Sequence, residues 1–197
     1  MTAVDPSEPM RRVAAMEAED SGFPDRITIS DGHTGSIPAD DASLHGAAVV
    51  QVLEHVADVP GALSELHRVL RPGGRVLIID TDWRSCVWHT TDTERTEAVL
   101  AVWRSRFEHP QLPAELEPLL LDAGFADVDV IPVPLLERRT DGEAYSLGML
   151  RTISAFAAEH AAIGPDIAAA WNQDVQSMAD AGRSFFGLTR YLITAHR

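Results

Sequence analysis

The chain has 197 residues and a mass of 21.4 kDa, which fits one domain of ordinary size. Its 45% hydrophobic and 23% charged residues, with no apolar run near the roughly 18 residues of a membrane helix, exclude disorder and a membrane span. A formal charge of -14 argues against nucleic acid as a partner. The single cysteine, Cys86, cannot form an internal disulfide and residues 1–20 lack the apolar core of a secretory signal, so we expect a cytoplasmic protein.

Short apolar runs alternate with amphipathic segments, which is typical of an α/β protein. We expect a doubly wound, mostly parallel sheet whose ligands lie beyond the carboxyl ends of the strands. Thr91 and Glu94 have the spacing of a capping box and predict a helix start. The predicted strands are 1–4, 26–30, 46–50, 75–80, 128–131 and 185–195, and the predicted helices lie in 8–20, 52–70, 91–107, 116–123, 150–157 and 167–178.

The middle of the chain contains three motifs in a specific order. They are Gln51-Val52-Leu53-Glu54-His55-Val56, Arg71-Pro72-Gly73-Gly74-Arg75 and Asp80-Thr81-Asp82-Trp83. Together they resemble the class I S-adenosylmethionine-dependent methyltransferases of the small-molecule type, which implies a Rossmann-like fold, S-adenosylmethionine as cofactor and methyl transfer to a small molecule. The resemblance extends over the whole chain as one domain, 1–197, with 83–113 and 140–182 as segments covering the substrate.

The resemblance fails at the amino end. That family opens with a strand, a Gly-x-Gly-x-Gly turn and a helix, and nothing before Asp5 supplies them. Without that strand, backbone donors and acceptors near Val4 and Val49 would have no partners. We therefore expect an N-terminally truncated domain, most simply from a start site assigned too late. The alternative is a natural half-domain that is completed by a partner chain or by swapping in a homo-oligomer.

The resemblance also implies four residues that bind the cofactor. Asp5 matches the carboxylate that accepts from the ribose hydroxyls, and Asp31 matches the acidic residue near the adenine amine. Gly32 would allow close backbone approach, and Gln51 opens the loop beyond the third strand. Each has a local alternative as a helix cap or a turn residue.

Two histidines are candidates for a catalytic base, His55 and His89, since both follow carboxyl ends of predicted strands. Local hydrogen bonding and a surface position are the alternatives. Trp83 and Trp88 either line an acceptor pocket or pack on the core. We expect Cys86 to be inert, and we expect no metal because no Cys/His cluster has ligand spacing.

Two functions therefore follow from the sequence. The first is methyl transfer from S-adenosylmethionine to a small molecule. The second is a degenerate, non-catalytic subunit with the same fold, which would not need the cofactor. A nicotinamide-dependent enzyme is disfavoured because no Gly-x-Gly-x-x-Gly follows a strand.

Overall fold

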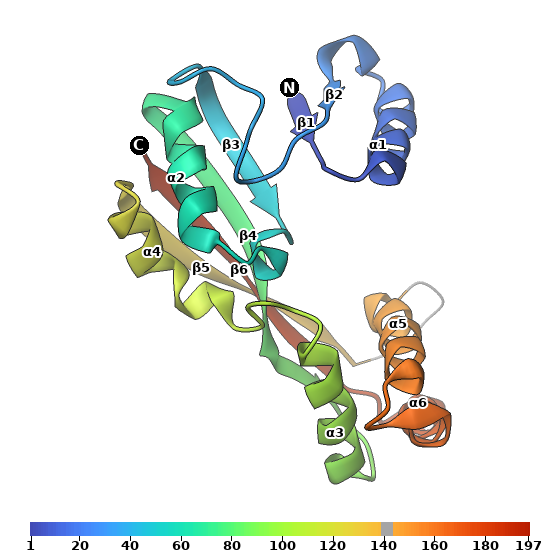
Figure 1. The fold of residues 1–197 in the computed structure, drawn as a ribbon. Helices are drawn as coiled ribbons and strands as arrows, with labels where there is room; N and C mark the ends of the chain where they lie inside the picture. The colour runs from blue at the N-terminus through green and yellow to red at the C-terminus, as the bar shows by residue number, and fades with distance from the viewer. Residues whose placement is uncertain (139–143) are drawn as a thin grey trace.

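A computed structural model describes residues 1–138 and 144–197 (Figure 1). Strands and helices alternate through most of the chain, as the sequence predicts. The strands are β1 (Thr2–Val4), β2 (Thr28–Ser30), β3 (Leu44–Val50), β4 (Leu70–Trp88), β5 (Ala126–Glu137) and β6 (Phe186–His196). The helices are α1 (Glu8–Asp20), α2 (Val59–Val69), α3 (Thr93–Arg104), α4 (Leu116–Asp122), α5 (Tyr145–Glu159) and α6 (Gly164–Asp180), with short 3-10 turns η1 (Pro24–Arg26), η2 (Leu53–His55) and η3 (Leu112–Ala114).

The strands form two separate sheets. One contains β1 and β2, which are parallel; the other has the order β3-β4-β6-β5, in which β6 runs against its neighbours β4 and β5. Within the described residues no strand pairs with the outer edge of β3 or with the second edge of β1. The expectation of unpartnered strands near Val4 and Val49 is therefore confirmed.

The core of the larger sheet lies under α2 and α4. Alternate residues of the central strands, such as Val76, Ile78 and Ile193, are at most 1% exposed and pack against Leu63 and Leu120 of the two helices. The run Arg71-Pro72-Gly73-Gly74 directly follows α2, as expected, because proline and glycine cannot continue the helix.

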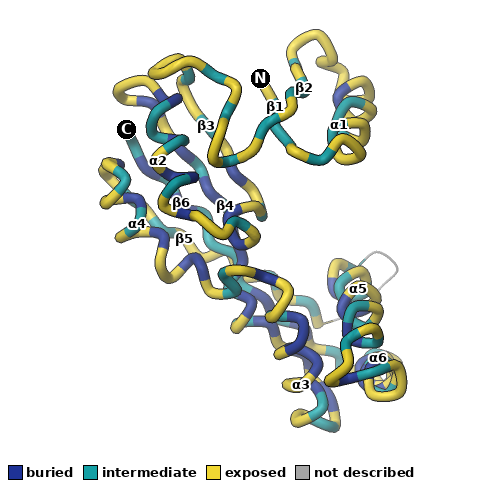
Figure 2. Tube along the Cα trace, viewed as in Figure 1, coloured by how far each residue is buried: buried dark blue, intermediate teal, exposed yellow. Residues whose placement is uncertain are grey.

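A second apolar cluster joins the ends of β4 and β6 to α3, α5 and α6 (Figure 2). Its centre is aromatic, with Trp88 edge-to-face on Trp171 at 5.4 Å and tilted against Phe186 at 4.6 Å. The predicted covering segments 83–113 and 140–182 build this cluster, apart from residues 140–143, which lie outside the described residues.

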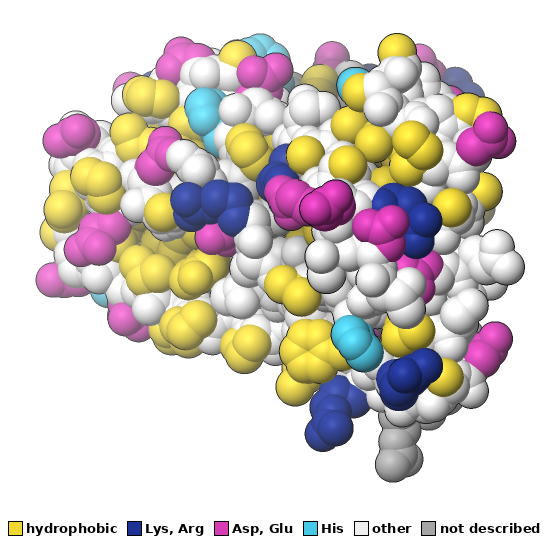
Figure 3. All heavy atoms as spheres, turned by 90° about the horizontal axis from the view of Figure 1, so that it is seen from below, with side chains coloured by type: hydrophobic (Ala, Val, Ile, Leu, Met, Phe, Trp, Pro, Cys, Tyr) yellow, Lys and Arg dark blue, Asp and Glu magenta, His cyan; other side chains and the backbone are white. Residues whose placement is uncertain are grey.

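Two features differ from the sequence analysis, and two more concern the helices and the distribution of charge. β4 is longer than predicted because it continues past Asp80 through a bulge between Asp82 and Val87. The predicted capping box is wrong, since Asp92 caps α3 and Thr91 bonds elsewhere. Among the described helices, none has the length and apolarity to cross a membrane. Figure 3 shows acidic, basic and apolar side chains interspersed on the face seen from below, so negative charge is not gathered into one patch there.

Candidate functional site

The ends of β1 and β2 bring Asp5 and Asp31 together. The two strands pair in parallel with Val4 opposite Ser30, so both aspartates leave their strands at the same end. Arg11 of α1 joins them, donating to the Asp5 carbonyl and to Asp31 Oδ1, each at 2.8 Å. Asp5 Oδ1 also accepts a hydrogen bond from the Ser7 N–H at 2.7 Å. Asp5 therefore also has the local role of a turn residue, which was the alternative to cofactor binding. Two carboxylates at adjacent strand ends are suited to bind neighbouring hydroxyl or amino groups.

Gly32 lets the loop after β2 cross the end of β1. Its φ is +155°, and a Cβ there would lie 2.8 Å from Val4 Cγ1 and 2.9 Å from Pro38 Cδ. Any other residue would push the loop away from β1. Gly32 therefore allows a close approach, as expected, and the segment approached is β1 of the same chain.

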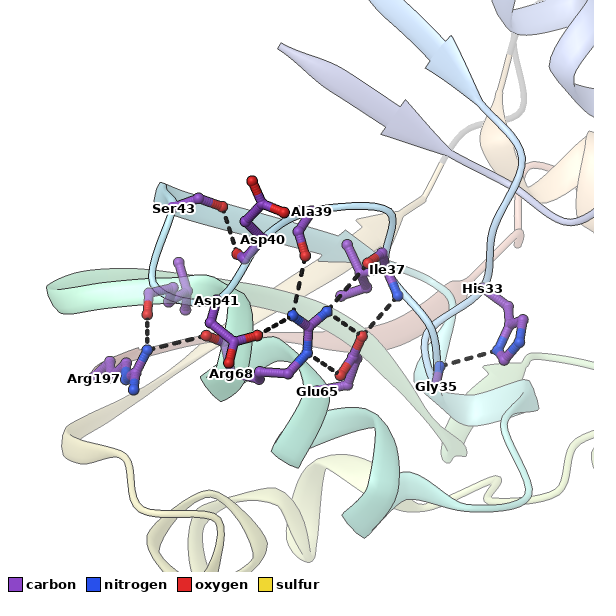
Figure 4. Close-up of polar contacts among 11 residues, drawn as sticks. His33, Gly35, Ile37, Ala39, Asp40, Asp41, Ser43, Glu65, Arg68 and Arg197 are labelled. Carbon is purple, nitrogen blue, oxygen red and sulfur yellow. Dashed lines mark hydrogen bonds and ion pairs between the residues drawn. The ribbon is translucent and has the colours of Figure 1, made fainter.

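Arg68 of α2 fixes the same loop further along (Figure 4). Its guanidinium donates two hydrogen bonds to Glu65, both at 2.7 Å, and one each to the carbonyls of Ala39 at 3.0 Å and Ile37 at 3.2 Å. It also pairs with Asp41, while Glu65 accepts from the Ile37 N–H at 2.9 Å. The hydrogen bonds from Arg68 hold the pKa of Glu65 below its ordinary value. The Glu65 carboxylate is therefore negatively charged at neutral pH and forms an ion pair with Arg68. Sequence reasoning missed Arg68, because its partners lie in a loop without periodicity.

Gln51 lies where β3 ends, in the left-handed backbone region with φ +55°. Its N–H donates to the Ile79 carbonyl of β4 at 2.7 Å, and its Oε1 accepts from Thr81 Oγ1 at 3.0 Å. Its Nε2 is buried and has no hydrogen-bond partner in the described part of the chain. A buried donor without a partner is costly unless a ligand accepts from it, so Gln51 fits a binding role.

Glu54 follows one turn later, 2% exposed, and connects β3 to β4. Its Oε2 accepts from the Trp83 indole N–H at 3.0 Å and from the Thr81 N–H at 3.4 Å. Its Oε1 lies 3.6 Å from His55 Nε2. Burial raises the pKa of Glu54, although both N–H donors act against that rise. The sequence analysis did not predict a role for Glu54. The signal that could have indicated one is a carboxylate placed among apolar residues directly after a predicted strand.

His55 is half-exposed next to Glu54. Its ring lies 5.0 Å from that of Phe107, and partial burial together with the positive charge of Arg106 lowers its pKa. The imidazole is therefore neutral at pH 7 and able to accept a proton.

Asp80 is fully buried beneath this group, at the centre of β4. The N–H groups of Val52, Leu53 and Glu54 favour its charged form, but none makes a hydrogen bond of good geometry to it. Burial first, and the nearby Glu54 second, raise the pKa of Asp80 to about 8. The carboxyl group is therefore largely protonated at neutral pH.

His89 lies in the other cluster, beyond the end of β4. Its Nδ1 is 2.8 Å from the carbonyl of Arg183, and the neighbouring Trp88 is 6% exposed in the aromatic core. Trp83 is likewise buried, stacked on Phe107 at 4.6 Å, so both tryptophans pack on the core. Burial raises the pKa of Cys86 to about 12, which matches the expected inert thiol.

The predicted residues thus fall into three places. Asp5, Asp31 and Gly32 lie together on the small sheet, Gln51 and His55 lie together at the end of β3, and His89 belongs to the α5–α6 side. The carboxylate pair and the partnerless Gln51 amide fit the polar half of an adenosine-containing cofactor. Among the described residues, no group of three or more His, Cys, Asp or Glu side chains could hold a metal ion.

Comparison with known proteins finds similarity to methyltransferases. A family model described as a methyltransferase domain matches residues 1–78. A 37.1 kDa protein of transposon TN4556 from Streptomyces fradiae is 32% identical over 86% of this chain and 47% of its own length. Demethylmenaquinone methyltransferase from Symbiobacterium thermophilum is 29% identical over 64% of this chain and 58% of its own.

The fold is also found in solved structures. The YcgJ protein from Bacillus subtilis superposes with a TM-score of 0.64 at 19% identity, covering 100% of this chain and 81% of that one. The chain spans about half the length of the curated relatives it matches. The motifs, the matched methyltransferase domain and the fold together support a class I S-adenosylmethionine-dependent methyltransferase.

Proposed function

We propose that these residues are part of an enzyme that transfers a methyl group from S-adenosylmethionine to a small molecule. The observation that carries this proposal is the parallel pairing of β1 and β2, which places Asp5 and Asp31 at one end of the small sheet. Asp5 accepts from the ribose hydroxyls, and Asp31 from the adenine amine. Gln51 donates its partnerless Nε2–H to the bound cofactor.

His55 is the residue best placed to remove a proton from the acceptor. The bound cofactor supplies an electrophilic methyl group, so the protein's main tasks are orientation and exclusion of water. His55 is neutral because its pKa is lowered, and the buried carboxylate of Glu54 at 3.6 Å stabilises the imidazolium that forms. His89 could act as the base only if the acceptor binds next to α5 and α6, because its ring lies beside the Arg183 carbonyl after α6.

Calorimetry with S-adenosylhomocysteine and with adenosine tests the proposal on residues 1–197. We expect adenosine to bind and both Asp5→Asn and Asp31→Asn to weaken its binding by about tenfold or more, because each removes a charge-assisted hydrogen bond. Asp25→Asn is the matched control, since Asp25 lies in η1, before the amino end of β2.

The non-catalytic alternative predicts a different outcome. If neither ligand binds, and Asp31→Asn changes only the stability that comes from its contact with Arg11, the chain is a scaffold with a methyltransferase fold. Binding that both aspartate variants leave unchanged would place the adenosine elsewhere and contradict the proposed site.

A further inference from the structure

Arg190 lies near the middle of β6, on the face of the larger sheet that points away from α2 and α4. In the register of the sheet it is opposite Thr81 of β4 and Val133 of β5. Ile193, three positions further along β6, is buried under α2 and α4, and successive side chains of a strand point to opposite faces. The Arg190 side chain therefore lies on the other face, where its guanidinium contacts Tyr145 at the start of α5.

Tyr145 holds this guanidinium by neutral contacts. Arg190 Nη2 donates to the Tyr145 hydroxyl at 2.8 Å in a solvent-exposed hydrogen bond, and the cation lies over the phenol ring, 5.1 Å from its centroid. The hydroxyl oxygen accepts from Arg190, so its own proton is left to be donated to a ligand. Glu137 fixes Tyr145 in turn, because its carboxylate accepts from the N–H groups of Tyr145 and Ser146 at 2.9 and 3.0 Å. Two donors are thus held next to each other at the surface.

The positive charge of Arg190 is not compensated by the part of the chain that the structure describes. There Arg190 forms no ion pair with a carboxylate, and its buried Nε has no hydrogen-bond partner. Other half-buried arginines are each paired with an Asp or Glu: Arg11, Arg68, Arg95 and Arg104. In a chain with 30 acidic and 16 basic residues, a fixed cation without an acidic partner indicates a position for an anion from outside the chain.

Arg190 is also close to the residues for which a role in methyl transfer is proposed. Its register partner Thr81 donates to Gln51 Oε1 at 3.0 Å. The Thr81 N–H donates to Glu54, the neighbour of His55, at 3.4 Å. Burial raises the pKa of Glu54, and the charge of Arg190 acts against that rise, so the two groups are near enough to interact. An anion on Arg190 therefore lies on the same part of the sheet as Gln51 and the candidate base.

We propose that Arg190 and the Tyr145 hydroxyl bind a carboxylate of the methyl acceptor, which makes the acceptor a small organic acid. The inference rests on the proposed function, because it takes the bound acid to be the substrate. A carboxylate offers two oxygens in one plane, one for the guanidinium and one for the phenol O–H. The body of the acid is apolar, since the exposed side chains beside Arg190 are Val133, at 39%, and the ring of Tyr145, at 38%.

Benzoate is the probe that tests this site, and benzamide is its neutral counterpart. Both are titrated by NMR into residues 1–197, and the readouts are the dissociation constant and the shift of the Arg190 Nε–H resonance. We expect benzoate to bind in about the millimolar range and benzamide to bind about tenfold or more weakly, because only the carboxylate makes a charge-assisted hydrogen bond.

Variants assign the binding to the two donors. We expect Arg190→Gln to weaken benzoate binding by about tenfold or more and Tyr145→Phe by about threefold, as for a charged and a neutral hydrogen bond. Arg151→Gln, which removes the same charge from an exposed position on α5, is the matched control and leaves the binding unchanged. If Arg190→Gln fails to fold, Arg190→Lys and Tyr145→Phe decide instead, and unchanged benzoate binding in both overturns the proposal.

Four other results overturn the carboxylate site. They are equal affinity for benzoate and benzamide, an Arg190 Nε–H resonance that benzoate does not shift, benzoate binding that Arg190→Gln leaves unchanged, and inorganic phosphate that binds more tightly than benzoate at the same residue. A fifth assigns Arg190 to the cofactor: Arg190→Gln then weakens S-adenosylhomocysteine and leaves adenosine unchanged.

Failure of the proposed function gives a different pattern. Adenosine then does not bind to residues 1–197, whereas benzoate still binds and still loses affinity in Arg190→Gln. If adenosine binds and benzoate does not, the acid-binding site alone is wrong.

Discussion

Asp80 at the centre of β4 and Glu54 in the turn after β3 are buried carboxyl groups, and both have raised pKa values. Burial favours the neutral form of each, and the closeness of the two carboxyls disfavours two negative charges. In the unfolded chain an aspartate titrates near pH 4. Folding at neutral pH therefore requires Asp80 to take up a proton.

This difference predicts how stability depends on pH. Between about pH 4 and the folded pKa of about 8, the native state binds one more proton at Asp80 than the unfolded state. The free energy of unfolding therefore falls as pH rises, by up to about 1.4 kcal/mol per pH unit from this group. Asp80→Asn, which is neutral at all pH values, removes this part of the slope. Chemical denaturation at pH 5, 6 and 7 measures it, and an equal slope in both proteins would contradict the raised pKa.

Arg68 is a second single residue with a structural role, because its side chain holds the loop after β2 in place. Its planar guanidinium contacts Glu65, Asp41 and two loop carbonyls together, which a lysine ammonium cannot do. In Arg68→Lys we expect the Ile37 amide to exchange about tenfold faster, because Glu65, which accepts from it, loses its two-point contact. Arg71→Lys, an exposed substitution just after α2, is the control. Equal exchange in all three proteins would show that the loop is held by other contacts.

At the scale of elements, Asp174 of α6 fixes the start of α3. Its carboxylate accepts from the N–H and hydroxyl of Thr91, the N–H of Asp92 and the guanidinium of Arg95. Burial acts to raise its pKa, but these donors outweigh burial and hold the pKa below the ordinary value. The negative charge also lies near the positive end of the α3 dipole.

Removing that charge should loosen the contact between α3 and α6. We expect Asp174→Asn to lower the free energy of unfolding at pH 7 by about 1–3 kcal/mol, the range for hydrogen bonds to a charged group. The folded pKa is lowered, so this stability is present above pH 4 and is lost as pH falls further. The difference between the two proteins in thermal unfolding should therefore shrink below pH 4. A difference that stays constant down to pH 2 would assign the effect to packing.

At the scale of the whole molecule, burial is uneven. Ala18 is the one buried residue of the first 30, whereas β4 has nine buried residues among its 19 and β6 has four among its 11 (Figure 2). A two-stranded sheet of three-residue strands has little stability of its own. We expect the amides of β1, α1 and β2 to exchange at least about a hundredfold faster than those of Ile78 and Ile193. Uniform exchange across both sheets would show that the small sheet is fastened by contacts other than burial.

Local patterns in the sequence predicted most of the fold. The apolar run at Val76 to Ile79, the Pro-Gly-Gly stop after α2 and the alternation of strands and helices are periodic or positional signals, readable without knowing what packs on them. The motifs at Gln51–Val56, Arg71–Arg75 and Asp80–Trp83 together indicated the family and predicted where a site would lie. The lack of a match to the family's first strand, glycine turn and helix before the strand at 1–4 predicted the unpaired edges.

Only the tertiary structure decided how the side chains are used. Glu54 and Asp80 are 26 positions apart, and nothing local to either shows that they share one buried region. Arg68 finds its partners 27 to 31 positions earlier in an irregular loop. His55 and His89 follow strand ends alike, yet the bulge and extension of β4 carry His89 to the other cluster. A sequence determines period and turn chemistry residue by residue, whereas desolvation, charge proximity and the choice of partner depend on which distant segments the fold brings together.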